Sequence, residues 1–181
     1  IVDARSFRNA IRVDMAIGGS TNTALHIPAI SREFGCPVDL SEFDRISREV
    51  PHITSLRPAG RHHIKDLDDA GGVPAVLNRL RGSLEDAPTV SGRRIAGIAE
   101  SAAVRDPEVI RPLDDPFHAQ GGIAVLKGNI APLGSVVKQA AVSPKMMVFS
   151  GRAKCYDSEK DAVEAIKSGA VGAGDAVVIR Y

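Results

Sequence analysis

The sequence predicts an α/β protein in two parts, a mostly helical part over residues 1–112 and a β-rich part over residues 113–181. In the first part, apolar residues recur at the spacing of a helix face, between capping residues and glycine stops. In the second part, short runs of β-branched residues stand between glycines and prolines, as strands do. The proline-rich stretch 111–116 is the predicted linker, and 181 residues suffice for one compact domain or two small ones.

The first predicted helix begins after Asp3, whose carboxylate can accept hydrogen bonds from the free backbone N–H groups of the first turn. Gly18 and Gly19 are predicted to end it, since glycine disfavours a helix interior. The predicted apolar face of this helix consists of Phe7, Ala10, Ile11 and Met15.

A second helix is predicted from the Ser20-Thr21 pair to Phe34, with one of the two hydroxyls as its cap. Pro28 lies inside this helix and should kink it, because proline lacks the N–H that a helix interior requires. Gly35 is the predicted stop.

The rest of the helical part contains shorter elements. Ser41 is predicted to cap a helix over residues 42–49, and Pro74 suits the first turn of a later helix. Residues 91–103 fit either helix or coil. The other predicted elements are a helix over residues 66–70, the helix of Pro74 ending near residue 81, and a short strand at residues 89–90.

In the β-rich part, one helix is predicted after Ser158, which opens a variant of the capping box with Asp161 in the acidic position. Runs of apolar and β-branched residues indicate the strands. The predicted strands cover residues 122–126, 135–138, 146–149 and 176–179, and Cys155 lies in a further β-type run.

Composition excludes several classes of function. The 23 basic and 22 acidic residues leave a net charge of +1, which is no electrostatic footprint for nucleic acid. No apolar run approaches the roughly 20 residues that span a bilayer, so a membrane partner is not expected. Cys36 and Cys155 form no C-x-x-C pair and imply no disulfide framework, so a reducing cytoplasm is the expected compartment.

The strongest local motif is Gly18-Gly19-Ser20-Thr21-Asn22-Thr23, placed before a helix. Free N–H groups at a helix start, with hydroxyls and an amide beside them, can bind a carboxylate or phosphate. Ser20, Thr21 and Asn22 are therefore the candidate substrate-binding residues. The alternative is that Ser20 or Thr21 only caps the helix while the glycines make the turn.

Other polar residues are interpreted as structural or exposed, and neither a catalytic nor a metal-binding residue is assigned. Adjacent histidines do not share a helix face, so His62-His63 is not a metal site by itself. The remaining residues given this interpretation are His26, His52, His118, Asp66, Asp68, Asp69, Cys36, Cys155, Lys127 and Lys138.

Residues 13–26, which contain Gly-Gly-Ser-Thr-Asn, resemble a signature of the dihydroxy-acid and 6-phosphogluconate dehydratase family. Thr23 and the region 109–132 are more similar to the dihydroxy-acid branch. Cys155 and Pro28 depart from the family pattern, standing where an apolar residue and a leucine are expected. The resemblance continues in family order through residues 43–47, 66–74, 109–112, 121–132, 158–159 and 174–181.

The resemblance implies that this is an internal segment, comprising the end of an α/β domain over residues 1–112 and the start of an aconitase-swivel-like β-barrel domain over residues 113–181. It implies a hydro-lyase that converts 2,3-dihydroxyisovalerate and 2,3-dihydroxy-3-methylvalerate to 2-keto acids in valine and isoleucine biosynthesis. It also implies a homodimer that uses an iron–sulfur cluster and Mg²⁺.

In the family pattern, the cluster cysteines and most magnesium ligands precede Ile1, while one magnesium glutamate and the base serine follow Tyr181. We therefore expect the natural chain to continue past Tyr181, and this segment alone to be inactive and to bind neither cofactor. The alternatives are a sugar-acid dehydratase of the same family, a non-catalytic small-ligand binding module, and a small subunit that completes a site on a larger partner.

Overall fold

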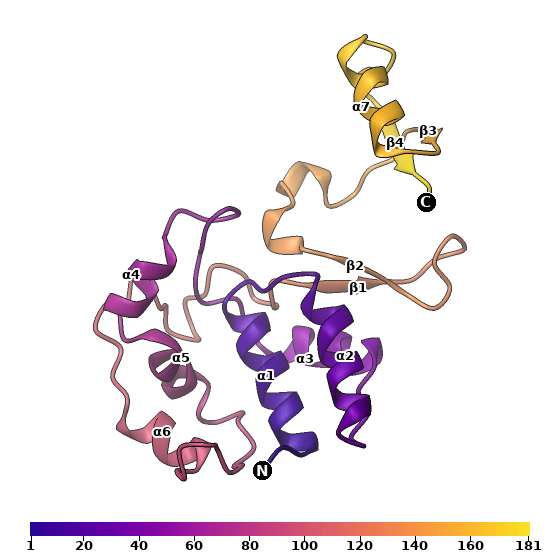
Figure 1. Cartoon of the computed structure of the whole chain (residues 1–181). Helices are drawn as coiled ribbons and strands as arrows, with labels where there is room; N and C mark the ends of the chain where they lie inside the picture. Colours follow the sequence, from indigo (N-terminus) through magenta and orange to yellow (C-terminus); the bar gives the residue numbers. More distant parts are fainter. The chain divides into compact units, whose positions relative to one another are not determined.

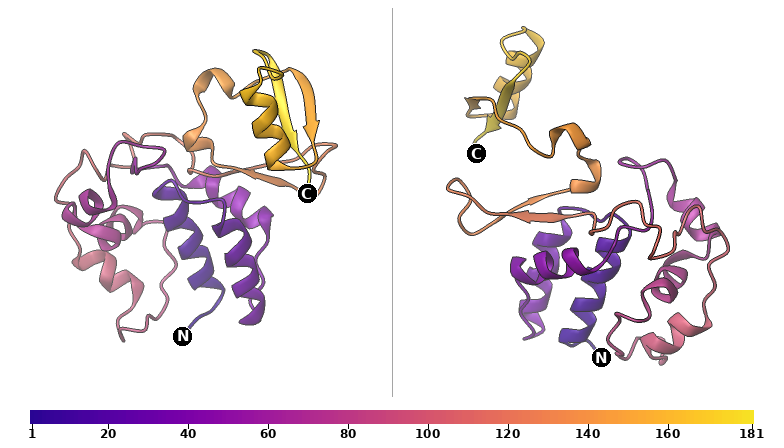
Figure 2. Two further views of the ribbon diagram at one scale, coloured as in Figure 1. Left: turned by 45° about the horizontal axis from the view of Figure 1, so that its top comes forward. Right: turned by 180° about the vertical axis from the view of Figure 1, so that it is seen from behind.

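A computed structural model describes all residues, 1–181, and divides them into two compact units, Ile1–Ala141 and Val142–Tyr181. The first unit is helix-rich and the second contains one helix and one small sheet (Figures 1 and 2). The chain is therefore mixed α/β, as the sequence predicts. The division between the compact units falls after Ala141 in the chain, whereas the domain boundary expected from the sequence lies at residue 112. No helix has the length and apolar character needed to cross a membrane.

Helix α1 (Ala4–Ala16) is the centre of the first unit. Asp3 caps it: its carboxylate accepts from the backbone N–H of Arg5 at 2.9 Å and of Ser6 at 3.2 Å, and the Ser6 hydroxyl accepts from the Asp3 N–H. Ile11 and Met15 on its apolar face are fully buried, as predicted. Ala10, predicted on the same face, is exposed because it lies at the edge of that stripe.

Helix α2 (Thr23–Glu33) begins later than expected. Neither Ser20 nor Thr21 caps it: the residue before the helix is Asn22, which has helical backbone angles and makes no side-chain cap bond. The predicted cap was wrong because the Ser20 hydroxyl accepts from the Asn22 N–H instead, at 3.3 Å, inside the turn. Gly35, with φ of +68°, follows the end of the helix as predicted.

Helix α3 (Leu40–Glu49) is capped by Asp39, not by Ser41. The Asp39 carboxylate accepts from the N–H groups of Ser41 at 2.9 Å and Glu42 at 3.3 Å, while the Ser41 hydroxyl donates to the same carboxylate. The Asp39 carboxylate caps the helix because it reaches two free N–H groups from the position just before the first turn, whereas Ser41 already lies inside that turn. Phe43 and Ile46 of α3 are fully buried and belong to the same core as α1.

Three shorter helices complete the helical layer: α4 (Ile64–Asp69), α5 (Gly72–Leu80) and α6 (Ile95–Ser101). Helix α6 resolves the ambiguous stretch 91–103, and the Asn78 amide donates to the carbonyl of Ala99 to join α5 to α6. The strand predicted at residues 89–90 is absent, since only Pro88 and Arg94 form an isolated bridge around a turn.

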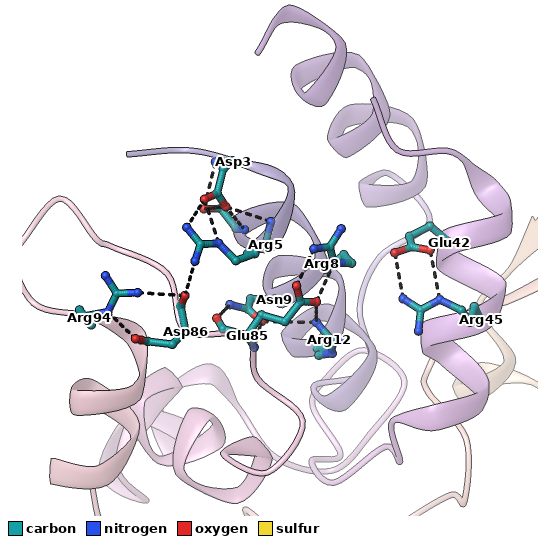
Figure 3. Close-up of polar contacts among 11 residues, drawn as sticks. Asp3, Arg5, Arg8, Asn9, Arg12, Glu42, Arg45, Glu85, Asp86 and Arg94 are labelled. Atoms are coloured by element: carbon teal, nitrogen blue, oxygen red, sulfur yellow. Dashed lines mark hydrogen bonds and ion pairs between the residues drawn. The ribbon is translucent and has the colours of Figure 1, made fainter. Parts of the chain in front are cut away.

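Glu85 links the loop after α5 to α1 by ion pairs and hydrogen bonds. Its carboxylate accepts from Arg8 at 2.6 and 2.5 Å and from Arg12 at 3.0 Å, and its backbone exchanges hydrogen bonds with the Asn9 amide (Figure 3). These hydrogen bonds and charges, Arg8 first, lower the pKa of Glu85 to about 2. Arg12 is buried, so this ion-pair network lies partly beneath the surface.

Strands β1 (Ala124–Leu126) and β2 (Ser135–Val137) form an antiparallel pair that belongs to the first unit. The residues before β1 are hydrogen-bonded to the helices: Gly122 N–H donates to the carbonyl of Met15, and the Ser47 hydroxyl donates to that of Ile123. Residues 113–141 therefore pack as an outer layer on α1 and α3.

The second unit is a β-α-β arrangement of β3 (Arg152–Tyr156), α7 (Glu159–Lys167) and β4 (Asp175–Ile179), with the two strands parallel. Ser158 caps α7 by accepting from the Asp161 N–H at 3.1 Å, as predicted. The strand predicted at residues 146–149 was wrong: Pro144, which lacks an N–H, starts the 3₁₀ turn η2 (Pro144–Met146) instead. Both sheets have only two strands, so these residues do not close into the barrel that the resemblance implies.

Candidate functional site

A cavity of about 460 Å³ lies in the first unit where the Gly18-Gly19 turn meets the loop that begins at His52. The turn follows α1, and the far wall comes from the residues just before and after the β1–β2 pair. The cavity is lined by Asp14, Ile17, Gly18, Gly19, Ser20, His52, Ser55, Leu56, Arg57, Ala59, Gly60, Phe117, His118, Lys138 and Ala140.

The two glycines of the turn are required by both backbone angle and space. Gly18 has φ of +87° and Gly19 has φ of +49°, in the left-handed region that side chains disfavour. A Cβ at Gly18 would lie 2.6 Å from Nε2 of His52, and one at Gly19 would lie 2.7 Å from a carboxylate oxygen of Asp14. The turn therefore sits directly on these two side chains.

Buried Asp14 stabilises the turn through a hydrogen bond to its side chain. Its Oδ2 lies 2.7 Å from the Thr23 hydroxyl, which is also 2.5 Å from the carbonyl oxygen of Ser20. Burial raises the pKa of Asp14, and the bonds from Thr23 and the Ser20 N–H, with the charge of Lys138, act in the opposite direction. The carboxylate thus ties the end of α1 to the start of α2.

Lys138 stabilises the turn through a hydrogen bond to its backbone. This residue directly follows β2, and its Nζ donates to the carbonyl oxygen of Gly19 at 2.6 Å. The interpretation of Lys138 as a surface charge was wrong, because the side chain is half-buried and lines the cavity. Nothing in the local pattern around Lys138 signals this, since its partner lies far away in the sequence.

His52 and His118, which the sequence presents as unrelated residues, are stacked. Their ring centroids are 5.4 Å apart with an interplanar angle of 7°, and their backbones are joined by N–H to carbonyl bonds of 3.0 and 3.3 Å. His52 is 5% exposed and interacts with the backbone of Thr54, so of the two expected alternatives it is not an exposed histidine.

The imidazole of His52 is neutral at pH 7. Burial, followed by the charges of His118 and Lys138, lowers the pKa of His52 to about 4. A neutral imidazole offers one donor and one acceptor nitrogen. His52 therefore adds no positive charge to the lining of the cavity.

The three residues predicted to bind substrate occupy different positions. Ser20 lines the cavity and is half-buried. Thr21 is exposed and lines a separate shallow pocket with Leu25 and Val136, while the exposed Asn22 makes no side-chain cap bond. The structure brings Ser20 together with Asp14, His52 and Lys138, which sequence reasoning did not assign to a site.

The side chains of this chain do not fit the donor set of an iron–sulfur cluster or a magnesium site. Such clusters use three or four ligands, whereas Cys36 and Cys155 belong to different compact units. No three His, Cys, Asp or Glu side chains come together to hold a metal ion. The nearest histidine–carboxylate pair outside the cavity, His62 and Asp66, is 4.0 Å apart, and Asp66 also accepts from the His63 N–H at 2.7 Å.

Comparison with protein families gives two matches that together cover most of the chain. Residues 1–98 match the family described as dihydroxy-acid/6-phosphogluconate dehydratase N-terminal, and residues 108–181 match the one described as dihydroxy-acid/6-phosphogluconate dehydratase C-terminal. The cavity draws on residues from both matched regions.

Curated relatives are similar over the whole chain. A dihydroxy-acid dehydratase of Methanothrix thermoacetophila is 55% identical over 186 residues, which cover 100% of this chain and 34% of the relative. Those of Thermodesulfovibrio yellowstonii and Archaeoglobus fulgidus are 51% and 53% identical, covering 100% and 99% of this chain and 33% of each relative. The chain thus spans about a third of the length of these relatives.

Proposed function

This chain belongs to the dihydroxy-acid/6-phosphogluconate dehydratase family, and on that premise we propose that it forms part of an enzyme that dehydrates 2,3-dihydroxy acids. The substrates would be 2,3-dihydroxyisovalerate and 2,3-dihydroxy-3-methylvalerate, and loss of water would give 2-keto acids for valine and isoleucine synthesis. Relatives that carry the name dihydroxy-acid dehydratase at 51–55% identity support this branch over the sugar-acid branch.

The observation that carries the proposal for this chain is the cavity beside the Gly18-Gly19 turn. The family signature lies at the same turn, where buried Asp14 accepts from the Thr23 hydroxyl and half-buried Lys138 donates to the Gly19 carbonyl. We propose that this cavity, which Ser20 lines, is the chain's share of the substrate site. We also propose that Thr21 and Asn22, which are exposed and lie outside the cavity, contact substrate from the surface. The iron–sulfur cluster and Mg²⁺ would be held by residues outside this chain, in a cytoplasmic homodimer.

The test of this function is an anaerobic assay of the complete gene product. We expect dehydration of 2,3-dihydroxyisovalerate to the 2-keto acid, with 6-phosphogluconate as the competing substrate. Preference for 6-phosphogluconate would move the assignment to the sugar-acid branch. Ligand binding without turnover by the metal-loaded protein would favour a binding module, and co-purification of a cysteine-rich partner would favour a small subunit.

Asn22→Ala separates a substrate contact from a structural role. Because Asn22 makes no cap bond, the free energy of unfolding should change by less than about 0.5 kcal/mol. Turnover should fall by about tenfold if the amide contacts substrate, a loss of about 1.4 kcal/mol. Steady-state kinetics and denaturant unfolding of the same variant measure both.

Thr23→Ala is the matched control one residue further on. Its hydroxyl bonds Asp14 and the Ser20 carbonyl, so stability should fall by about 1 kcal/mol. An Asn22→Ala enzyme with normal turnover would remove Asn22 from the substrate site. An Asn22→Ala variant as destabilised as Thr23→Ala would show that its role is structural.

A further inference from the structure

Lys138 has an unusual environment for a half-buried cation. Its Nζ makes one hydrogen bond, to the Gly19 carbonyl at 2.6 Å, and no carboxylate lies within ion-pair distance. An ammonium carries three donors. The two remaining donors are therefore available to an anionic ligand beside the cavity.

The charges of Asp14 and Lys138 act on each other, and both residues line the cavity. Asp14 is engaged with the Thr23 hydroxyl and the Ser20 N–H, and it forms no salt bridge with Lys138. Arg57 adds a second cationic side chain to the lining, whereas buried His52 is neutral at pH 7. The polar part of the cavity thus favours a negatively charged group.

Apolar side chains make up another part of the lining, which also includes Ser20, Ser55 and His118. Ile17, Leu56, Phe117 and Ala140 face the same cavity, and its volume of about 460 Å³ holds a small molecule. A lining that combines two cationic side chains with aliphatic and aromatic ones suits a short branched carboxylic acid.

We propose that Lys138 binds the carboxylate of the ligand, and that the apolar wall of the cavity receives its branched aliphatic part. The proposal rests on the proposed function, since the ligand would be the substrate or product of that reaction. Lys138 then serves two purposes, because the ammonium that holds the Gly19 carbonyl also receives the carboxylate.

The first experiment measures binding of the branched 2-keto acid and its primary amide to the complete gene product by calorimetry. In Lys138→Met, affinity for the acid should fall by about tenfold, as expected when a charged hydrogen bond is lost, while affinity for the amide stays unchanged. Lys138→Arg should retain the preference for the acid. Lys127→Met, at an exposed position after β1, is the control and should behave as the wild type.

A second measurement uses the wild-type protein, so that a variant that fails to fold does not decide the result. The keto acid should slow modification of Lys138 by an amine-reactive reagent and leave Lys127 unaffected, as read by mass spectrometry, whereas the amide should protect neither. Equal protection by acid and amide would overturn the proposal, as would equal loss of both ligands in Lys138→Met. Inorganic phosphate that protects as well as the keto acid would overturn the assignment to a carboxylate.

These results are separable from the proposed function. A protein that dehydrates 2,3-dihydroxy acids but shows no role for Lys138 in acid binding would refute this inference alone. A protein that binds the keto acid through Lys138 without dehydrating any 2,3-dihydroxy acid would refute the proposed function alone.

Discussion

Gly18→Ala should destabilise the first compact unit by about 3 kcal/mol and abolish activity of the complete enzyme. The left-handed backbone at φ of +87° disfavours any Cβ, and here the Cβ would also lie 2.6 Å from Nε2 of His52. His52 cannot retreat easily, because it is buried, stacked on His118 and bonded to it through both backbones. Denaturant unfolding measures the stability, and a dehydration assay measures the activity.

Gly35→Ala is the matched control for the backbone term. Gly35 also has a positive φ, +68°, but a Cβ there would meet nothing within 4 Å. Gly35→Ala should therefore lower the free energy of unfolding only by the cost of a left-handed backbone at a residue with a Cβ, about 1–2 kcal/mol. In a His52→Ala background, the penalty of Gly18→Ala should fall to the Gly35→Ala value. Equal penalties for the two glycines in the wild-type background would show that contact with His52 does not constrain the turn.

Glu85→Gln should destabilise the chain by about 2 kcal/mol near pH 7. The substitution removes the charge between Arg8 and Arg12, and Arg12 is buried, so its guanidinium loses its only carboxylate (Figure 3). The backbone bonds between Glu85 and the Asn9 amide remain possible in the variant. Denaturant unfolding of the two proteins gives the difference.

The pH dependence gives this prediction a second readout. The pKa of Glu85 falls from 4.5 to about 2 on folding. A lowered pKa contributes stability that is complete above pH 4.5 and lost as pH falls toward about 2. The stability difference between wild type and Glu85→Gln should therefore shrink across this window.

Glu42→Gln is the control, because Glu42 pairs with the exposed Arg45 within a single helix. Glu42→Gln should lower the free energy of unfolding by less than about 1 kcal/mol. A Glu85→Gln chain no less stable than Glu42→Gln would show that the network does not fasten the loop to α1.

Several elements are determined by the sequence itself, because their signals are local. Asp3 and Ser158 reach the N–H groups of the turn that follows each of them, so their helices could be placed from a few adjacent residues. The Gly18-Gly19 turn and the stop at Gly35 follow from the backbone freedom of glycine alone. The family, too, follows from the sequence, because its signature is a run of consecutive residues.

Where two neighbouring residues can each cap a helix, the local sequence does not determine which of them does so. Asp39 and Ser41 are both good caps, so spacing did not decide which side chain reaches the free N–H groups of α3. Ser20 and Thr21 both precede α2, yet neither caps it. The strand expected at residues 146–149 had the apolar composition of a strand but lacked a partner strand, and isolated strands are not stable.

The site beside the turn was decided only by the tertiary structure. His52, His118 and Lys138 come from three distant parts of the chain, and each one alone has the sequence context of an ordinary surface or core residue. Their meeting depends on the packing of residues 113–141 against α1 and α3, through bonds such as that from Gly122 to Met15. Burial and proximity, which set the charge state of His52 and give Lys138 its place beside Gly19, are properties of that packing and leave no periodicity in the sequence.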